Sequence, residues 1–82
     1  MLSQVVLKPV SYFSRDEEIS ARIERTIRSR AGGRIQDLRV EVNGGDVVVS
    51  GRTNTYYAKQ LATHAAMDEI SQRSLTNSIE VI

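Results

Sequence analysis

The sequence predicts an α+β fold, a two-layer sandwich in which two helices cover one face of a three-stranded mixed sheet. The expected order is helix-strand-strand-helix-strand (αββαβ). Residues 14–31 carry apolar side chains at four-residue spacing, which is typical of a helix with one buried face. Valines then alternate with polar residues on both sides of Asn43-Gly44-Gly45-Asp46, as in an antiparallel hairpin. An alanine-rich stretch and a final alternating segment follow, and two layers can bury all of these apolar stripes.

The first helix has recognisable start and stop signals. A capping box that begins at Ser14 opens it, and acidic residues in the next turn favour the positive end of a helix. Ile19, Ile23 and Ile27 form the buried stripe. The pair Gly32-Gly33 then ends the helix, because glycine readily leaves the helical conformation.

The hairpin comes next, and its glycines have separate tasks. Gly44 and Gly45 allow the positive φ angles that tight turns between antiparallel strands require. Gly51 is in phase with Val47 and Val49, so it is expected to face the core. A glycine weakens a strand unless something needs the space. We therefore expect Gly51 to provide clearance for the second helix.

The second helix is expected to start near Asn54 or Thr55, both of which are suitable caps. The last strand covers about residues 75–82, with Leu75, Ile79 and Val81 directed inward. A right-handed crossover through the helix makes this strand parallel to the second strand, which becomes central. The small-residue face of the helix comprises Ala58, Leu61, Ala62, Ala65 and Ala66, extended by Ile70.

Size and composition limit the class of protein. The 82 residues are expected to form a flexible or extended arm (1–13) and one domain (14–82). The chain has no cysteine, no apolar run long enough to cross a membrane, and no secretory signal at its start. A complete chain would therefore be cytoplasmic, whereas an excised or processed domain would fit the periplasm or cell envelope.

The hairpin and the last segment together resemble the BON domain, the family of bacterial osmotic-shock and nodulation domains. The resemblance lies in Gly45-x-Val47-x-Val49-x-Gly51, preceded by Leu38 and Val40, and in the ending Leu75-Thr76-Asn77-Ser78-Ile79-Glu80-Val81. It covers about residues 16–81. It implies a non-enzymatic module that associates with phospholipid surfaces or envelope components. No functional residues are shared across that family, so none are transferred to this chain.

Catalytic and metal-binding patterns are missing from the sequence. His64 is the only histidine, and it lies opposite the alanine face without cysteines or a nearby acidic pair. The stretch Ala31-Gly32-Gly33-Arg34-Ile35 ends a helix and lacks the lysine and hydroxyl residue of a phosphate loop. No nucleophile has an evident base. We therefore expect no enzyme activity, no metal and no cofactor.

The predicted topology collects basic residues at one end of the domain. Four segments meet there: the end of helix one, the loop after it, the end of strand two and the start of helix two. One of the two adjacent tyrosines is expected to be packed and the other exposed. Complementing helix dipoles would also explain the arrangement. The candidate anion- or lipid-facing residues are Arg28, Arg30, Arg34, Arg52, Tyr56 and Tyr57, with Lys59 nearby. The opposite end is expected to hold Asp16, Glu17, Glu18, Asp46, Asp68 and Glu69.

Two classes of function fit these features. The first is a binding module for anionic phospholipid surfaces or envelope proteins that acts through the arginine-rich end. The alternative is a protein–protein assembly module that acts through the exposed edge of the first strand or the polar outer face of the sheet. A net charge of +1 argues against a dedicated nucleic-acid binder. The oligomeric state is left open.

Overall fold

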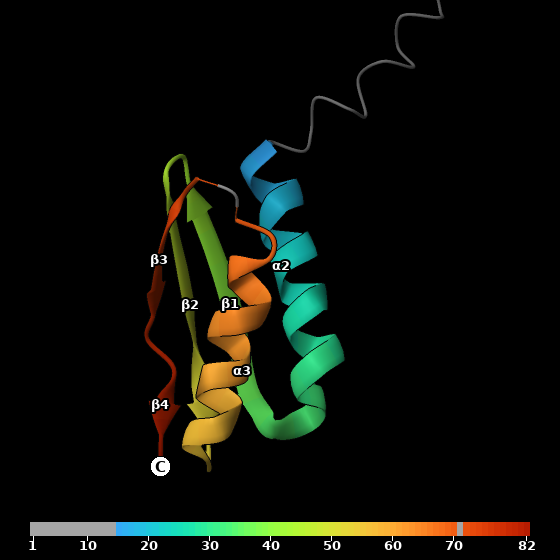
Figure 1. The fold of residues 1–82 in the computed structure, drawn as a ribbon, viewed down its shortest axis with the longest axis vertical. Coiled ribbons are helices and arrows are strands. Elements are labelled where there is room, and N and C mark those ends of the chain that lie inside the picture. Colours follow the sequence, from blue (N-terminus) through green and yellow to red (C-terminus); the bar gives the residue numbers. More distant parts are fainter. Residues whose placement is uncertain (1–14, 71) are drawn as a thin grey trace, which may run out of the picture.

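The computed structural model describes residues 15–70 and 72–82 and has the expected order of elements (Figure 1). The expected arm (1–13) and the expected cap Ser14 lie outside the described residues. The elements are α2 (Arg15–Ala31), the 3-10 turn η1 (Gly32–Arg34), β1 (Ile35–Asn43), β2 (Asp46–Thr53), α3 (Tyr56–Met67), β3 (Ser74–Asn77) and β4 (Glu80–Val81). The αββαβ prediction is confirmed.

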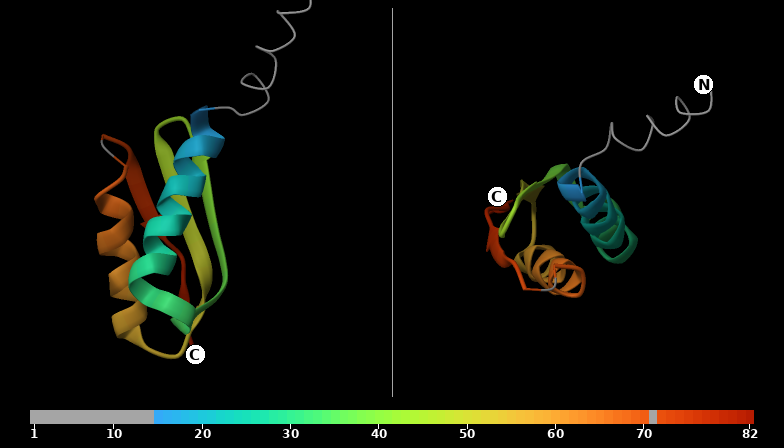
Figure 2. Two further views of the ribbon diagram at one scale, coloured as in Figure 1. Left: turned by 90° about the vertical axis from the view of Figure 1, so that its right-hand side faces the viewer. Right: turned by 90° about the horizontal axis from the view of Figure 1, so that it is seen from above.

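The described residues form two layers, with α2 and α3 side by side on one face of the sheet (Figure 2). Strand β2 is central, as expected: it pairs antiparallel with β1 and parallel with β3 and β4. The last strand is divided, because β3 and β4 follow one another along the same edge of β2 with Ser78 and Ile79 between them. The third position of the predicted sheet is therefore filled by two short strands.

The core lies between the sheet and the helices, as the apolar periodicity predicts. Ile23 and Ile27 of α2 are fully buried, and Ile19 packs against the edge of the core. The alanines of the small-residue face (Ala58, Ala62, Ala65 and Ala66) are also fully buried. Val81 was expected to face inward, but 43% of it is exposed, because it lies in β4 at the margin of the sheet.

Gly51 makes room for β1 and not for α3, so the expected reason for this glycine is wrong. Between the pairs Gln36–Arg52 and Arg39–Ser50, two residues of β1 oppose Gly51 alone, which is a β-bulge. A Cβ at Gly51 would lie 2.9 Å from the Gln36 carbonyl oxygen and 3.0 Å from a methyl group of Ile35. The backbone of Gly51 also has φ +152, a conformation almost confined to glycine.

Of the two turn glycines, Gly44 has the predicted positive φ angle and Gly45 does not. Gly44 has φ +59, the positive angle that a two-residue type II′ turn needs at its first central position, and Asn43 pairs with Asp46 across that turn. Gly32 has φ +62 directly after the last residue of α2, which is how helices often end.

Candidate anion-facing end

The pairing of the strands brings four separate segments to one end of the fold. Ile35, which follows η1, pairs with Thr53 at the end of β2, and Thr53 also pairs with Val81 of β4. The first turn of α3 starts three residues after Thr53. We call this end, where α2 finishes and α3 begins, the basic end (Figure 1). The residues expected at this end are Arg28, Arg30, Arg34, Arg52, Tyr56, Tyr57 and Lys59.

Both tyrosines at the start of α3 are exposed, so the expectation that one ring is packed is wrong. Tyr56 is 63% exposed and Tyr57 is 64% exposed. Helical side chains lean toward the N-terminus of their helix, which here directs both rings beyond the end of the core. Thr55 caps the helix as predicted, since its side-chain oxygen accepts a hydrogen bond from the Ala58 N–H at 3.1 Å.

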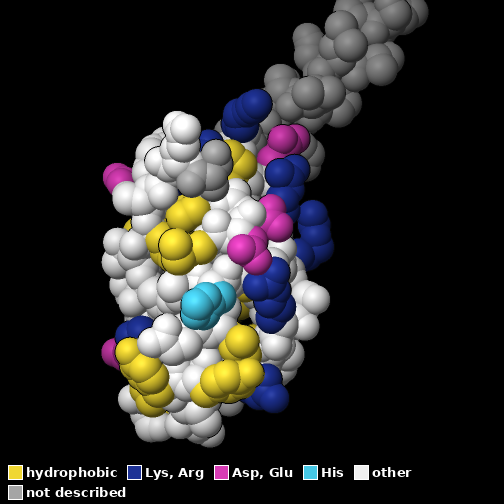
Figure 3. Space-filling model, viewed as in Figure 1, with side chains coloured by type: hydrophobic (Ala, Val, Ile, Leu, Met, Phe, Trp, Pro, Cys, Tyr) yellow, Lys and Arg dark blue, Asp and Glu magenta, His cyan; other side chains and the backbone are white. Residues whose placement is uncertain are grey.

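Exposed apolar side chains gather at the same end. Among the described residues, five large hydrophobic side chains are exposed, and Val81 and Ile82 join the two tyrosines beside the end of β2. Only Met67 lies elsewhere, at the last turn of α3. Figure 3 shows apolar and basic side chains next to one another over this part of the surface. The basic end therefore combines aromatic, aliphatic and cationic groups.

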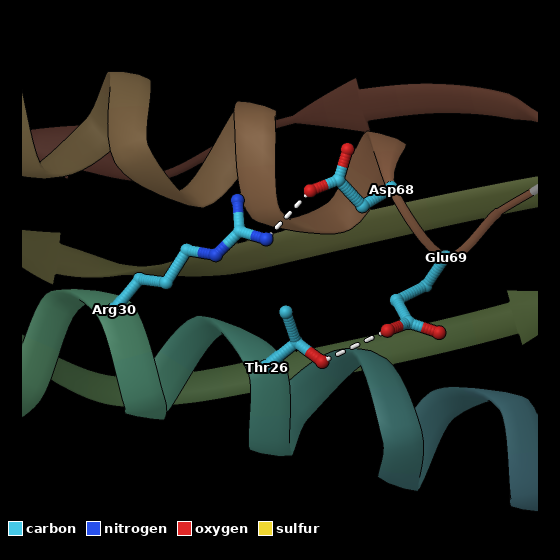
Figure 4. A network of polar contacts seen from close by, with 4 residues as sticks. All are labelled: Thr26, Arg30, Asp68 and Glu69. Atoms are coloured by element: carbon cyan, nitrogen blue, oxygen red, sulfur yellow. Dashed lines mark hydrogen bonds and ion pairs between the residues drawn. The ribbon is translucent and has the colours of Figure 1, made fainter.

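Two of the expected arginines turn away from the basic end. The guanidinium of Arg28 lies 3.0 Å from Glu24, one helical turn back along α2. The guanidinium of Arg30 lies 2.6 Å from Asp68, which follows the last residue of α3 (Figure 4). The lean of helical side chains explains both directions, because the N-terminus of α2 is at the opposite end of the fold.

Arg34, Arg52 and the half-buried Lys59 are left to carry the charge of the basic end. The side chain of Arg34, in η1, forms no hydrogen bond or ion pair with any residue in 15–70 or 72–82. Arg52 donates a hydrogen bond to Asp37 at the β-bulge, and Glu80 is its register partner in β4. Arg34 is thus the cation most available to an external anion.

The acidic residues are less segregated than the sequence indicates. Asp16 accepts a hydrogen bond from the Gly44 N–H at 3.0 Å, and Asp46 accepts one from the Ser74 hydroxyl at 2.8 Å, so both lie at the hairpin end. Asp68 reaches back to Arg30, and Glu69 accepts a hydrogen bond from Thr26 at 3.1 Å (Figure 4). These contacts join α3 to α2 and reduce the expected separation of charge.

Two structural residues were missed by the sequence reasoning. The Asn77 side chain donates to the Lys59 carbonyl at 2.9 Å and to Thr63 at 2.7 Å, and it accepts from the Ile79 N–H at 3.0 Å. Arg73 donates to the Gly44 carbonyl at 2.9 Å, which holds the hairpin turn. No local sequence signal marks this role of Asn77, because Lys59 and Thr63 lie 18 and 14 residues away from it in the chain.

Within the described part of the chain, no group of histidine, cysteine and acidic residues could hold a metal ion. His64 is exposed, as its helical phase predicts. Between residues 15 and 82, leaving out residue 71, no helix has both the length and the apolar character needed to span a bilayer.

These features define a small two-layer α+β module with an exposed, chemically mixed end. The family model of the BON domain matches residues 15–82, and the chain belongs to that family. BON domains are a family of non-catalytic binding domains associated with membrane or envelope interactions. A comparison with curated proteins finds no match.

Proposed function

We propose that this BON domain is a non-enzymatic module that binds anionic phospholipid surfaces or envelope partners through its basic end. The observation that carries the proposal is the pair of exposed tyrosines in the same end as Arg34 and Arg52. Tyrosine suits a membrane interface because its ring is apolar and its hydroxyl is polar. Arginine suits phosphate because its planar guanidinium donates several hydrogen bonds.

The ion pairs of Arg28, Arg30 and Arg52 are compatible with this function. All three pairs are solvent-exposed, and an exposed pair is worth only about 0–1 kcal/mol. A phosphate that approaches Arg52 can therefore replace Asp37 at little cost. Arg34 needs no such exchange, which makes it the first residue to test.

Charge reversal at Arg34 should weaken binding to anionic vesicles. A basic residue near an anionic membrane contributes about 1 kcal/mol, so Arg34→Glu should cost about 1–2 kcal/mol, or roughly five- to thirty-fold in affinity. The double variant Tyr56→Ser with Tyr57→Ser should also weaken binding, but with less dependence on salt. Co-sedimentation with vesicles of equal parts phosphatidylglycerol and phosphatidylcholine measures both effects.

Arg25→Glu is the matched control, because Arg25 is exposed on α2 and the variant has the same net charge as Arg34→Glu. It should retain most of the binding, and vesicles of phosphatidylcholine alone should bind none of the variants. Equal losses for Arg34→Glu and Arg25→Glu would mean that only net charge matters. That result would contradict the proposal that the basic end is the binding surface.

Protein assembly through the free edge of β1 is a second candidate function, favoured by one observation. Among residues 15–70 and 72–82, strand β1 pairs with β2 alone, and its nine residues form one margin of the sheet. An exposed edge of this length can accept another strand.

A further inference from the structure

The edge of β1 presents backbone hydrogen-bonding groups at Val40 that have no partner among the described residues. The Val49 carbonyl accepts a hydrogen bond from the Ser78 N–H at 2.7 Å, so the polar backbone groups of Val49 face the β3 side of the sheet. Val40 is the antiparallel partner of Val49. In an antiparallel pair, the N–H and C=O groups of the two residues either all point toward the partner strand or all point away from it. The N–H and C=O of Val40 therefore point away from β2, and the same alternation applies to Val42.

No described element covers this edge. An open hollow of about 470 Å³ lies beside it, between the first turns of α2 and residues 40–43 of β1. The outer-face side chains at the edge are Arg39 and Glu41, which are exposed, and the inner-face ones are Leu38, Val40 and Val42. An approaching strand thus meets free backbone groups and, on the outer face, two opposite charges, whereas the inner-face side chains are already buried in the core.

We infer that β1 pairs antiparallel with β1 of a second copy of this chain, about a two-fold axis at Val40. This inference rests on the assembly candidate and is independent of vesicle binding. In this register Val40 faces Val40 of the second copy and exchanges two backbone hydrogen bonds with it. Leu38 faces Val42 on the apolar side. Arg39 faces Glu41 of the second copy, and Glu41 faces Arg39, so the same charge pair forms twice.

The charges also select this register over its neighbours. A shift of two residues in one direction sets Arg39 against Arg39 of the second copy, and a shift in the other sets Glu41 against Glu41. Like charges directly opposite each other destabilise an antiparallel pair. The favourable pairs occupy the non-hydrogen-bonded positions, where side chains on adjacent strands are closest. Residues 39–42 lie outside the bulge between Gln36 and Arg39, and Leu38 is the bulge residue next to them. This self-complementarity favours a second copy over an unrelated peptide.

Sedimentation velocity of the full chain, from about 10 µM to 1 mM, tests the inference. The unmodified chain should pass from monomer to dimer. Arg39→Glu and Glu41→Arg should each weaken self-association about ten-fold or more, because both pairs of the interface become repulsive. A mixture of these two variants should form a dimer of one chain of each, since every pair is then opposite in charge. The double variant Arg39→Glu with Glu41→Arg should dimerise by itself.

Arg25→Glu serves again as the control of equal charge and should dimerise like the unmodified chain. Hydrogen exchange at the Val40 amide should slow as the concentration rises, whereas the Arg39 amide should change little. A chain that stays monomeric at 1 mM would overturn the inference. So would a dimer that is indifferent to Arg39→Glu, or two weakened variants that fail to associate with each other. Retained vesicle binding by Arg39→Glu would separate this surface from the basic end.

Discussion

At the scale of single residues, Gly51 has the most demanding environment. Its φ of +152 and the Gln36 oxygen 2.9 Å from a Cβ position both exclude a side chain. Gly51→Ala should therefore lower the free energy of unfolding by about 2–4 kcal/mol, from backbone strain and the contact with β1 together. Urea unfolding followed by circular dichroism measures this loss.

Gly33→Ala is a suitable control, because no atom lies within 4 Å of a Cβ at Gly33 and its φ is not positive. It should change the free energy of unfolding by less than about 1 kcal/mol. Equal losses in the free energy of unfolding for the two substitutions would contradict the close approach of β1 to Gly51.

The sequence identifies Gly51 as unusual, but it does not indicate that β1 is the element that approaches this glycine. Period-two alternation predicts which face a strand residue occupies, and the burial of Val47 and Val49 confirms it. The bulge at Asp37 and Leu38 leaves no such mark, because it depends on the register between two strands. The exposure of both Tyr56 and Tyr57 depends likewise on where the core ends.

At the scale of elements, Asn77 joins the last strand to α3. Its side chain makes three hydrogen bonds at the point where β3 ends. Asn77→Ala should lower the free energy of unfolding by about 1–3 kcal/mol, because it leaves partly buried groups such as Thr63 without their partner. Thermal unfolding of Asn77→Ala and of Thr76→Ala, each compared with the unmodified chain, measures the difference in stability. Thr76 is exposed on the outer face, so its loss should stay within about 0.5 kcal/mol.

A loss no greater for Asn77→Ala than for Thr76→Ala would contradict the role assigned to Asn77.

The sequence predicts the helices and the hairpin well, because isoleucine spacing, alternating valines and paired glycines are local signals. The division of the last strand is not predicted, because two of the three partners that hold Asn77 at this point lie 14 and 18 residues away.

At the scale of the whole molecule, topology determines which charges share a surface. The sequence correctly brings Arg34, Arg52 and the start of α3 to one end. It overstates the separation of charge, because the pairing of Arg30 with Asp68 depends on how α2 and α3 lie against each other. The direction of helical side chains then leaves Arg34, Arg52 and the two tyrosines as the outward groups of the basic end.

The central claim is that the basic end faces the anionic surface, and an NMR titration with bicelles that contain phosphatidylglycerol tests it most directly. Amide shifts should concentrate at residues 32–34 and 52–57 and shrink as salt is raised, since charge interactions fall off within about 10 Å at 0.1 M salt. Shifts confined to the outer face of the sheet, at Arg39, Glu41 and Thr76, or no shifts at all, would contradict the claim.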